Sequence, residues 1–135
     1  MHREARIGTT RLMSPAVVLA LSAACGNDLE PACLPVVRAA VEVEVRDAAT
    51  EELRADLARG VVQDGAFTDS LQIVRSDGPH GAPSALGAAW ERPGTYSIRI
   101  EREGYQPWDT SGVHVQADQC GASPAQLVAR LSPAA

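Results

Sequence analysis

The possible chemical roles can be narrowed furthest for the three cysteines of this sequence, Cys25, Cys33 and Cys120. A cysteine thiol can be acylated, can pair in a disulfide, or can bind a metal ion. Structural zinc sites combine four cysteines and histidines, and this chain has neither further cysteines nor a histidine pair beside them. We therefore expect no metal at these cysteines, which leaves acylation and disulfide formation.

Cys25 directly follows a segment with the features of a secretory signal. Residues 1–11 carry three arginines, residues 12–24 are mostly apolar, and small residues precede the cysteine. The apolar stretch is shorter than the roughly 20 residues that cross a bilayer, and Pro15 disfavours a buried core helix. Because this pattern resembles a bacterial lipoprotein signal, we predict that residues 1–24 are a signal peptide. Cys25 would then become the lipidated first residue and anchor the protein to a membrane.

Plain secretion is the alternative to lipidation. A lipoprotein signal usually has Leu three residues before the cysteine, but Ser22 occupies that position here and Leu21 lies one place earlier. Ordinary signal peptidase accepts small residues such as Ser22 and Ala24 before its cleavage site. Either cleavage places the protein outside the cytoplasm, in the cell envelope or secreted. Gly26, in place of an aspartate after Cys25, favours sorting to the outer membrane or its periplasmic face.

The two remaining cysteines are predicted to form a disulfide. If Cys25 is acylated, Cys33 and Cys120 form an even pair in an oxidising compartment, where disulfides persist. Both lie in polar, turn-like sequence, which disfavours the alternative of two free buried thiols. A bridge between them would tie the start of the mature chain to its last strand.

The other residues with ligating or catalytic side chains form no recognised motif. His80 and His114 lack the close spacing of zinc ligands, no serine lies in a Gly-x-Ser-x-Gly turn, and no phosphate-binding glycine loop is present. We therefore expect no catalytic residue and no cofactor. A calcium role for Asp64 or Asp69 is the alternative. Because strand alternation turns Asp69 inward, we expect either a β-bulge there or a carboxylate that caps backbone amides.

Charge excludes nucleic acid as a partner. Loss of residues 1–24 removes three arginines and one glutamate, which takes the formal net charge from −5 to −7. So acidic a chain does not bind nucleic acid electrostatically or dock on anionic lipid through a basic patch. The mature length suits one domain. We assign residues 25–34 to a tether and residues 35–132 to the domain.

Four segments alternate apolar and polar residues with period two, which predicts half-buried strands: 40–46, 95–101, 113–115 and 127–131. Between them stand turn signals at Asp47, Asp64-Gly65, Arg92-Pro93-Gly94, Glu103-Gly104, Ser111-Gly112 and Gly121. Short strands at this spacing predict an antiparallel β-sandwich of about seven strands.

Two segments are ambiguous. Residues 50–60 have the composition of a helical turn, with acids at the start and Gly60 at the end, but a hairpin whose first strand begins near Ala55 is equally compatible with the sequence. In either case we expect the strand to have started by Arg59. Residues 76–88 are rich in Pro, Gly, Ala and Ser, which predicts a loop. That loop is either a recognition surface or disordered.

The five aromatic residues are expected in the core or at its rim. Pro93 and Gly94 would form a turn before the strand that begins with Tyr96. After Gly104 reverses the chain, Tyr105 would fold over the sandwich edge, with its hydroxyl on a backbone acceptor.

The order of these motifs is similar to that of carboxypeptidase regulatory-like (transthyretin-like) domains in bacterial surface lipoproteins. The resemblance covers roughly residues 33–132 and is most specific from Pro93 to Tyr105, with Cys33 and Cys120 also matching. It implies about seven strands in two sheets, and a domain that accompanies peptidases without carrying their active site. We therefore expect a non-catalytic envelope lipoprotein with a structural or binding module for a protein or glycan. An accessory domain of a peptidase or transport complex is the alternative.

Overall fold

The computed structural model describes residues 32–135, so the predicted signal peptide and Cys25 lie outside the described residues. In chain order the elements are β1 (Ala39–Asp47), β2 (Arg59–Asp64), β3 (Phe67–Ser70), β4 (Gln72–Arg75), the 3₁₀ turn η1 (Pro79–Gly81), β5 (Ala85–Trp90), β6 (Gly94–Glu101), β7 (Trp108–Val115), β8 (Ala117–Asp118), β9 (Gly121–Ala122) and β10 (Ala125–Leu131).

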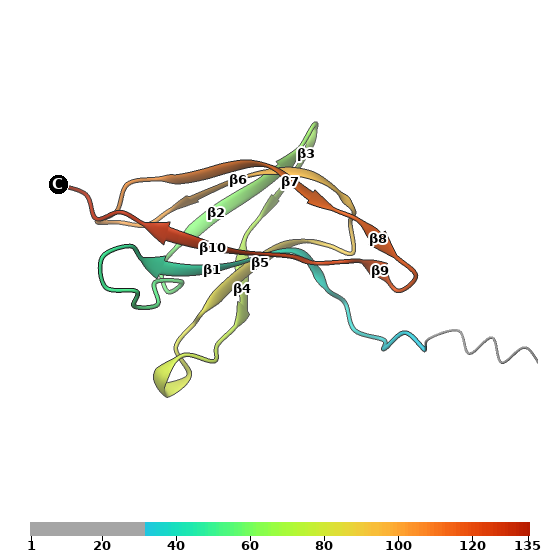
Figure 1. Ribbon diagram of the computed structural model, residues 1–135, viewed down its shortest axis with the longest axis horizontal. Coiled ribbons are helices and arrows are strands. Elements are labelled where there is room, and N and C mark those ends of the chain that lie inside the picture. The colour runs from blue at the N-terminus through green and yellow to red at the C-terminus, as the bar shows by residue number, and fades with distance from the viewer. Residues whose placement is uncertain (1–31) are drawn as a thin grey trace, which may run out of the picture. The chain divides into compact units, whose positions relative to one another are not determined.

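The strands form two four-stranded sheets that share one core (Figure 1). One sheet has the order β10-β1-β5-β4, the other has the order β3-β2-β6-β7, and β8 and β9 form a separate two-stranded ribbon. This arrangement confirms the predicted all-β sandwich. Neighbouring strands are antiparallel except β1 and β10, which run parallel with Val43 opposite Leu127. The parallel pair arises because the chain leaves the second sheet after β7 and crosses to the first through the β8–β9 ribbon.

The core is built by the alternating strands that the sequence predicts. Strands β1 and β6 each bury one face, while the charged residues on the other face are half-buried in β1 and exposed in β6. Their large fully or almost fully buried side chains are Val41, Val43, Val45, Tyr96, Ile98 and Ile100. Burial of each such side chain contributes about 1.5–3 kcal/mol relative to exposure. The two strands come from different sheets, so their inward residues hold the sheets together.

The aromatic residues were expected in the core or at its rim, which Tyr96 matches and Trp90 does not. Tyr96 is fully buried, donates its hydroxyl proton to the carbonyl of Arg92 (2.5 Å), and meets the edge of Phe67 with ring centroids 6.4 Å apart. Phe67, Tyr105 and Trp108 pack partly buried against the core. Trp90, however, is 43% exposed. It ends β5 at the edge of the molecule, where core contacts run out.

The hydroxyl of Tyr105 finds a carboxylate, so the expectation of a backbone acceptor is wrong. It donates to Asp47 Oδ2 (2.7 Å) and accepts from Arg54 Nε (2.9 Å). The other carboxylate oxygen of Asp47 accepts from the amides of Ala49 (2.7 Å) and Thr50 (3.0 Å). A buried carboxylate needs such donors. The bond from Tyr105, followed by those two amides, lowers the pKa of Asp47 below its ordinary value of 3.8.

This geometry predicts that the domain loses stability in acid. Because the pKa of Asp47 is lower in the folded than in the unfolded chain, the unfolded chain binds more protons as pH falls. The contribution of Asp47 is therefore complete above about pH 4 and is lost as pH drops through the folded pKa. Urea unfolding at pH 7 and pH 3 should show a smaller loss of unfolding free energy for Asp47→Asn than for wild type. An equal loss in both would contradict the assignment, and Tyr105→Phe should give an intermediate loss because it removes one donor only.

Residues 50–58 form neither a helical turn nor a strand that begins near Ala55, but β2 does begin at Arg59, as expected. The chain instead runs back along β1, where the amide of Asp47 donates to the Glu52 carbonyl (2.8 Å) and the amide of Arg54 to the Val45 carbonyl (2.8 Å). These tertiary bonds override a weak local preference for helix. Leu57 then adopts a positive φ of 60° in the turn before β2.

The expectation that residues 76–88 form one loop is wrong at its C-terminal end. Residues 85–88 belong to β5, which is the buried inner neighbour of β1 and β4. Residues 85–89 are all buried, so both faces of the strand are covered and small residues fit there. A Cβ at Gly87 would lie 2.8 Å from side-chain atoms of Ala39 on β1 and of Val74 on β4, the neighbouring strands of the sheet. The remaining loop is held by the Gly78 amide on the Ala82 carbonyl (3.1 Å).

The structure shows the local conformation at two positions for which the sequence made specific predictions, Asp69 and Ser111-Gly112. Asp69 caps backbone amides, as one of its two expected roles required: its oxygens accept from the amides of Ser70 (2.9 Å) and Ala89 (2.9 Å). Ser111 and Gly112 were expected to form a turn between elements, which is wrong. They form a β-bulge inside β7, opposite Ser97, and Gly112 has a φ of +69°. Glycine is favoured there because it adopts positive φ without steric cost.

Candidate functional site

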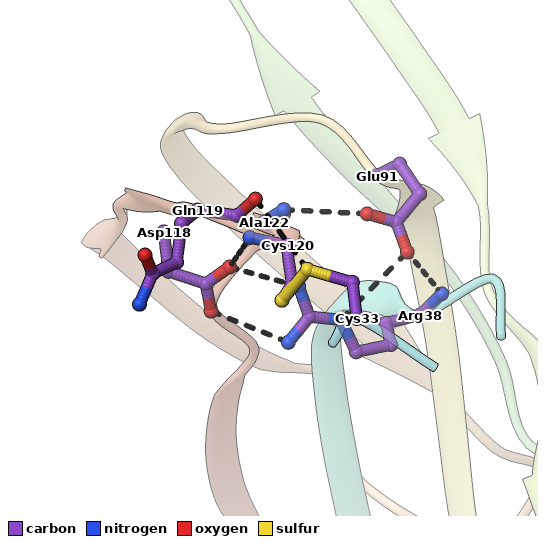
Figure 2. Close-up of a disulfide and its surroundings, with 7 residues drawn as sticks. All are labelled: Cys33, Arg38, Glu91, Asp118, Gln119, Cys120 and Ala122. Carbon is purple, nitrogen blue, oxygen red and sulfur yellow. Dashed lines mark hydrogen bonds and ion pairs between the residues drawn. A yellow bond between two sulfur atoms is a disulfide. The ribbon is translucent and has the colours of Figure 1, made fainter. Parts of the chain in front are cut away.

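Cys33 and Cys120 form a disulfide, with 5.3 Å between their Cα atoms (Figure 2). Cys33 lies just before β1, and Cys120 lies in the turn between β8 and β9. The bridge therefore fixes the first described residues of the domain to the ribbon that connects its two sheets. Figure 2 draws the residues that we call the disulfide corner: Cys33, Arg38, Glu91, Asp118, Gln119, Cys120 and Ala122.

The carboxylate of Glu91 lies at the centre of the disulfide corner. One of its oxygens accepts from the backbone amide of Arg38 (2.5 Å), and the other accepts from the amide of Ala122 (3.3 Å). The amide of Glu91 in turn donates to the carbonyl of Arg38 (2.9 Å). One side chain from the β5–β6 turn thus joins the start of β1 to β9, and it occupies amides that would otherwise lack a partner.

Arg38 and Asp118 add a paired charge to the corner. The guanidinium donates to both carboxylate oxygens, at 3.3 and 3.2 Å, and Asp118 also accepts from the amide of Cys120 (2.7 Å). A two-pronged pair of this kind fixes direction as well as distance. The hydrogen bond from Arg38, and then that from the Cys120 amide, lowers the pKa of Asp118.

Gly121 is required by the close packing of this corner. Its φ is +117°, and a Cβ there would lie 2.0 Å from Glu91 Oε2. Any other residue would strain the backbone and displace the carboxylate. The turn signal at this glycine therefore reflects the corner around it as well as the reversal of the chain.

The end of the sandwich away from the disulfide corner carries an open groove of about 820 Å³. We call it the far groove; it is lined by Leu57, Ala58, Arg59, Glu101, Arg102, Glu103, Tyr105 and Pro107. Arg102 is committed to Asp56, through its carbonyl (2.8 Å) and its carboxylate (3.1 Å). Arg59, by contrast, forms no ion pair within residues 32–135, although the other described arginines all do.

Leu57 is the most exposed large apolar side chain of the described residues, at 82%. It also holds a positive φ, which costs a non-glycine residue on the order of 1–3 kcal/mol. An exposed, strained apolar residue beside an unpaired arginine is typical of a surface shaped for binding.

The candidate residues for chemistry lie apart from one another. His80 lies in η1, and His114 Nδ1 contacts Thr95 Oγ1 (3.1 Å) on the exposed face of β7. Asp64 pairs with Arg92 (2.9 Å), and Asp69 caps amides as described above. Within residues 32–135 no three potential metal-ligating side chains come together, and no helix there is long and apolar enough to span a membrane.

A scan against protein-family models finds no match to this chain, and a search of curated proteins finds no similar sequence. A function for this protein must therefore be inferred from its fold and from the two ends of the sandwich. Sequence reasoning found the bridge but missed Arg38, Glu91 and Asp118 beside it, and Leu57 and Arg59 in the far groove. The turn residues Pro93 and Gly121 were the only local signal near the corner.

Proposed function

We propose that this protein is a non-catalytic lipoprotein of the cell envelope, anchored through Cys25, whose β-sandwich presents the far groove to a protein partner. The observation that carries the proposal is that the disulfide corner and the far groove lie at opposite ends of the sandwich. The chain joins the sandwich at the disulfide corner, where β1 begins, and the far groove lies where β1 ends (Figure 1). A tether attached at one end leaves the other end facing away from the anchor.

The strand registers place the two ends. Gly94 of β6 pairs with Val115 of β7 near the corner, whereas Ile100 pairs with Trp108 at the far end. Arg59 at the start of β2 pairs with Glu101 at the end of β6, which puts the groove at that far end. Strands of seven to nine residues separate the ends, so the domain acts as a rigid spacer between anchor and groove.

The lining of the far groove indicates the chemistry of the partner. Leu57, Tyr105 and Pro107 offer an apolar surface, and Arg59 offers an uncommitted guanidinium. Such a combination suits a segment that carries a carboxylate next to an apolar side chain, since Arg binds carboxylates through two parallel hydrogen bonds. A protein partner is favoured over a glycan because the exposed aliphatic side chain of Leu57 offers no hydrogen bond to sugar hydroxyls.

A non-catalytic role is supported by how the polar side chains are used. The hydroxyl of Ser84 has one proton to donate, to the carboxylate of Asp77 or to the carbonyl of Arg75, and either bond helps to hold the loop before β5. The resemblance to carboxypeptidase regulatory-like domains supports the same role. It also supports the second candidate, an accessory domain of a peptidase or transport complex, for which the partner would be the enzyme or transporter.

Substitution of the far groove should weaken partner capture about tenfold or more, since an ion pair and an apolar contact together exceed about 1.4 kcal/mol. Anchored wild type, Leu57→Ser/Arg59→Glu and a matched surface control, Ile73→Ser/Arg130→Glu, would be crosslinked in the native envelope. The captured proteins would then be identified by mass spectrometry. We expect one envelope protein with wild type and control that is absent with the groove variant. Equal capture by all three would contradict the groove as the binding surface.

A further inference from the structure

Apolar side chains gather just after Cys33, where the chain joins the sandwich. Leu34, Val36 and Val37 are 78%, 61% and 69% exposed, although they directly precede the most deeply buried strand of the core. Scattered exposed apolar residues are normal on a protein surface. Three within four residues, all beside the bridge, are a patch that has a cost in water.

Trp90 extends this patch from a second element. It lies opposite Ala39 in the β1–β5 pairing, two residues after Val37, and its neighbour Glu91 is hydrogen-bonded to Arg38 on both the amide and the carbonyl. Strand β5 therefore brings an exposed indole to the same end of the sandwich as residues 34–37. Tryptophan is the side chain most enriched where an apolar layer meets water.

The charged side chains of the disulfide corner are paired with one another. They therefore oppose transfer of the patch into an apolar environment less than unpaired charges would. Arg38 pairs with Glu91 (3.8 Å) and Asp118 (3.2 Å), so the charges nearest the patch neutralise one another in part. Asp64, which lies beside Gly94 at the same end of the strands, is likewise paired with Arg92 (2.9 Å). The charged side chains at the end of the domain nearest the anchor are thus engaged with one another.

The length of chain before the patch restricts what can cover it. Cys33 lies eight positions after Cys25, and a chain of that length spans at most about 28 Å when fully extended. If Cys25 is acylated, as the proposed function requires, the patch stays within that distance of the bilayer surface. The bridge holds the patch at the start of the rigid domain, so the patch cannot move away from the anchor on a longer segment.

We propose that Leu34, Val36, Val37 and Trp90 form a docking surface that lies in the interfacial layer of the phospholipid membrane. The inference rests on the anchoring in the proposed function. The docking surface holds the sandwich upright, with the far groove pointing away from the bilayer. It recognises the boundary between headgroups and acyl chains through apolar burial, without a basic patch, which agrees with the acidic charge of the chain.

Two single-tryptophan variants test this orientation. In Trp108→Phe the emission reports Trp90, and in Trp90→Phe it reports Trp108, which lies at the far end of β7. The unacylated mature chain has one free thiol, Cys25, because the other two cysteines are bridged. It would be coupled through that thiol to maleimide headgroups in vesicles of phosphatidylcholine and phosphatidylethanolamine. Some of these vesicles would carry bromine near the start of the acyl chains.

Docking predicts that Trp90 loses most of its emission in brominated vesicles and shifts to shorter wavelength, while Trp108 does neither. Leu34→Ser/Val37→Ser should restore the emission of Trp90, and the surface control Ile73→Ser should not. Equal quenching of both tryptophans, or of neither, would overturn the proposal, as would quenching of Trp90 that survives Leu34→Ser/Val37→Ser. A spectral shift that depends on protein density and not on bromine would show instead that a second copy covers the patch, and would also overturn it.

Chemical coupling separates this test from the test of the anchor. The vesicle experiment supplies the attachment itself, so its outcome does not depend on acylation in the cell. Failure of the protein from its native membrane to behave as a lipoprotein would therefore contradict the proposed function, whereas an unquenched Trp90 on coupled vesicles would contradict the docking surface.

Discussion

Cys120→Ser is expected to lower the free energy of unfolding by about 2–5 kcal/mol, the range for loss of a native disulfide in a small domain outside the cytoplasm. The bridge spans 87 residues of sequence. In the chain-entropy description, a loop of that size corresponds to about 4–5 kcal/mol, most of it from restriction of the unfolded chain. Because a domain of this size has a total stability of only about 5–15 kcal/mol, the loss is large enough to shift the urea midpoint clearly.

Comparison with chemical reduction separates the bridge from the side chain. Urea unfolding would be measured for wild type, reduced wild type, Cys120→Ser and Cys33→Ser/Cys120→Ser, all in a Cys25→Ser background. The three forms without a bridge should unfold at similar concentrations, below that of oxidised wild type. If a thiol-reactive dye labels both cysteines in unreduced, unfolded wild type, the bridge does not form and the prediction is wrong.

Loss of the bridge should leave the rest of the disulfide corner partly in place. Glu91 still accepts from the amides of Arg38 and Ala122, and Arg38 still pairs with Asp118. The double variant Cys120→Ser/Glu91→Gln should therefore lose more free energy of unfolding than the sum of the losses for the two single variants, because the effects of neighbours in one network are not additive.

The strands and the bridge could be predicted from sequence because their signals are local or arithmetic. Strand β1 alternates Val41, Val43 and Val45 with charged residues, and a half-buried strand has this period of two. The bridge follows from parity, since acylation of one of three cysteines leaves a pair. Neither inference requires knowledge of which segments meet in space.

Segments whose structure depends on distant neighbours could not be predicted in this way. Strand β5 consists largely of small residues because it is buried on both faces and is flanked within the sheet by β1 and β4, and the same composition is typical of loops. Residues 50–58 have helix-forming side chains, but backbone bonds to β1 decide their path. In both cases tertiary packing overrides local preference.

The candidate site residues were missed for the same reason. Arg38 is 53 residues from Glu91 and 80 residues from Asp118, and each reads in sequence as an ordinary surface charge. Leu57 belongs to a pattern that would bury it in a helix, yet the turn before β2 exposes it. Only the assembled sandwich shows that these side chains gather at two opposite ends.

The largest effect on location is expected from Cys25→Ser. Each buried CH₂ of an acyl chain contributes about 0.8 kcal/mol, so one chain binds marginally and two or more hold the protein firmly on a membrane. Wild type should therefore enter the detergent phase when membranes are phase-partitioned, and Cys25→Ser should be found unprocessed or in the aqueous phase. Cys120→Ser is the matched control, because it also removes a thiol but should stay with detergent. Wild type found wholly in the aqueous phase would contradict acylation, and cleavage after Ala24 without lipid would then explain the position of Cys25.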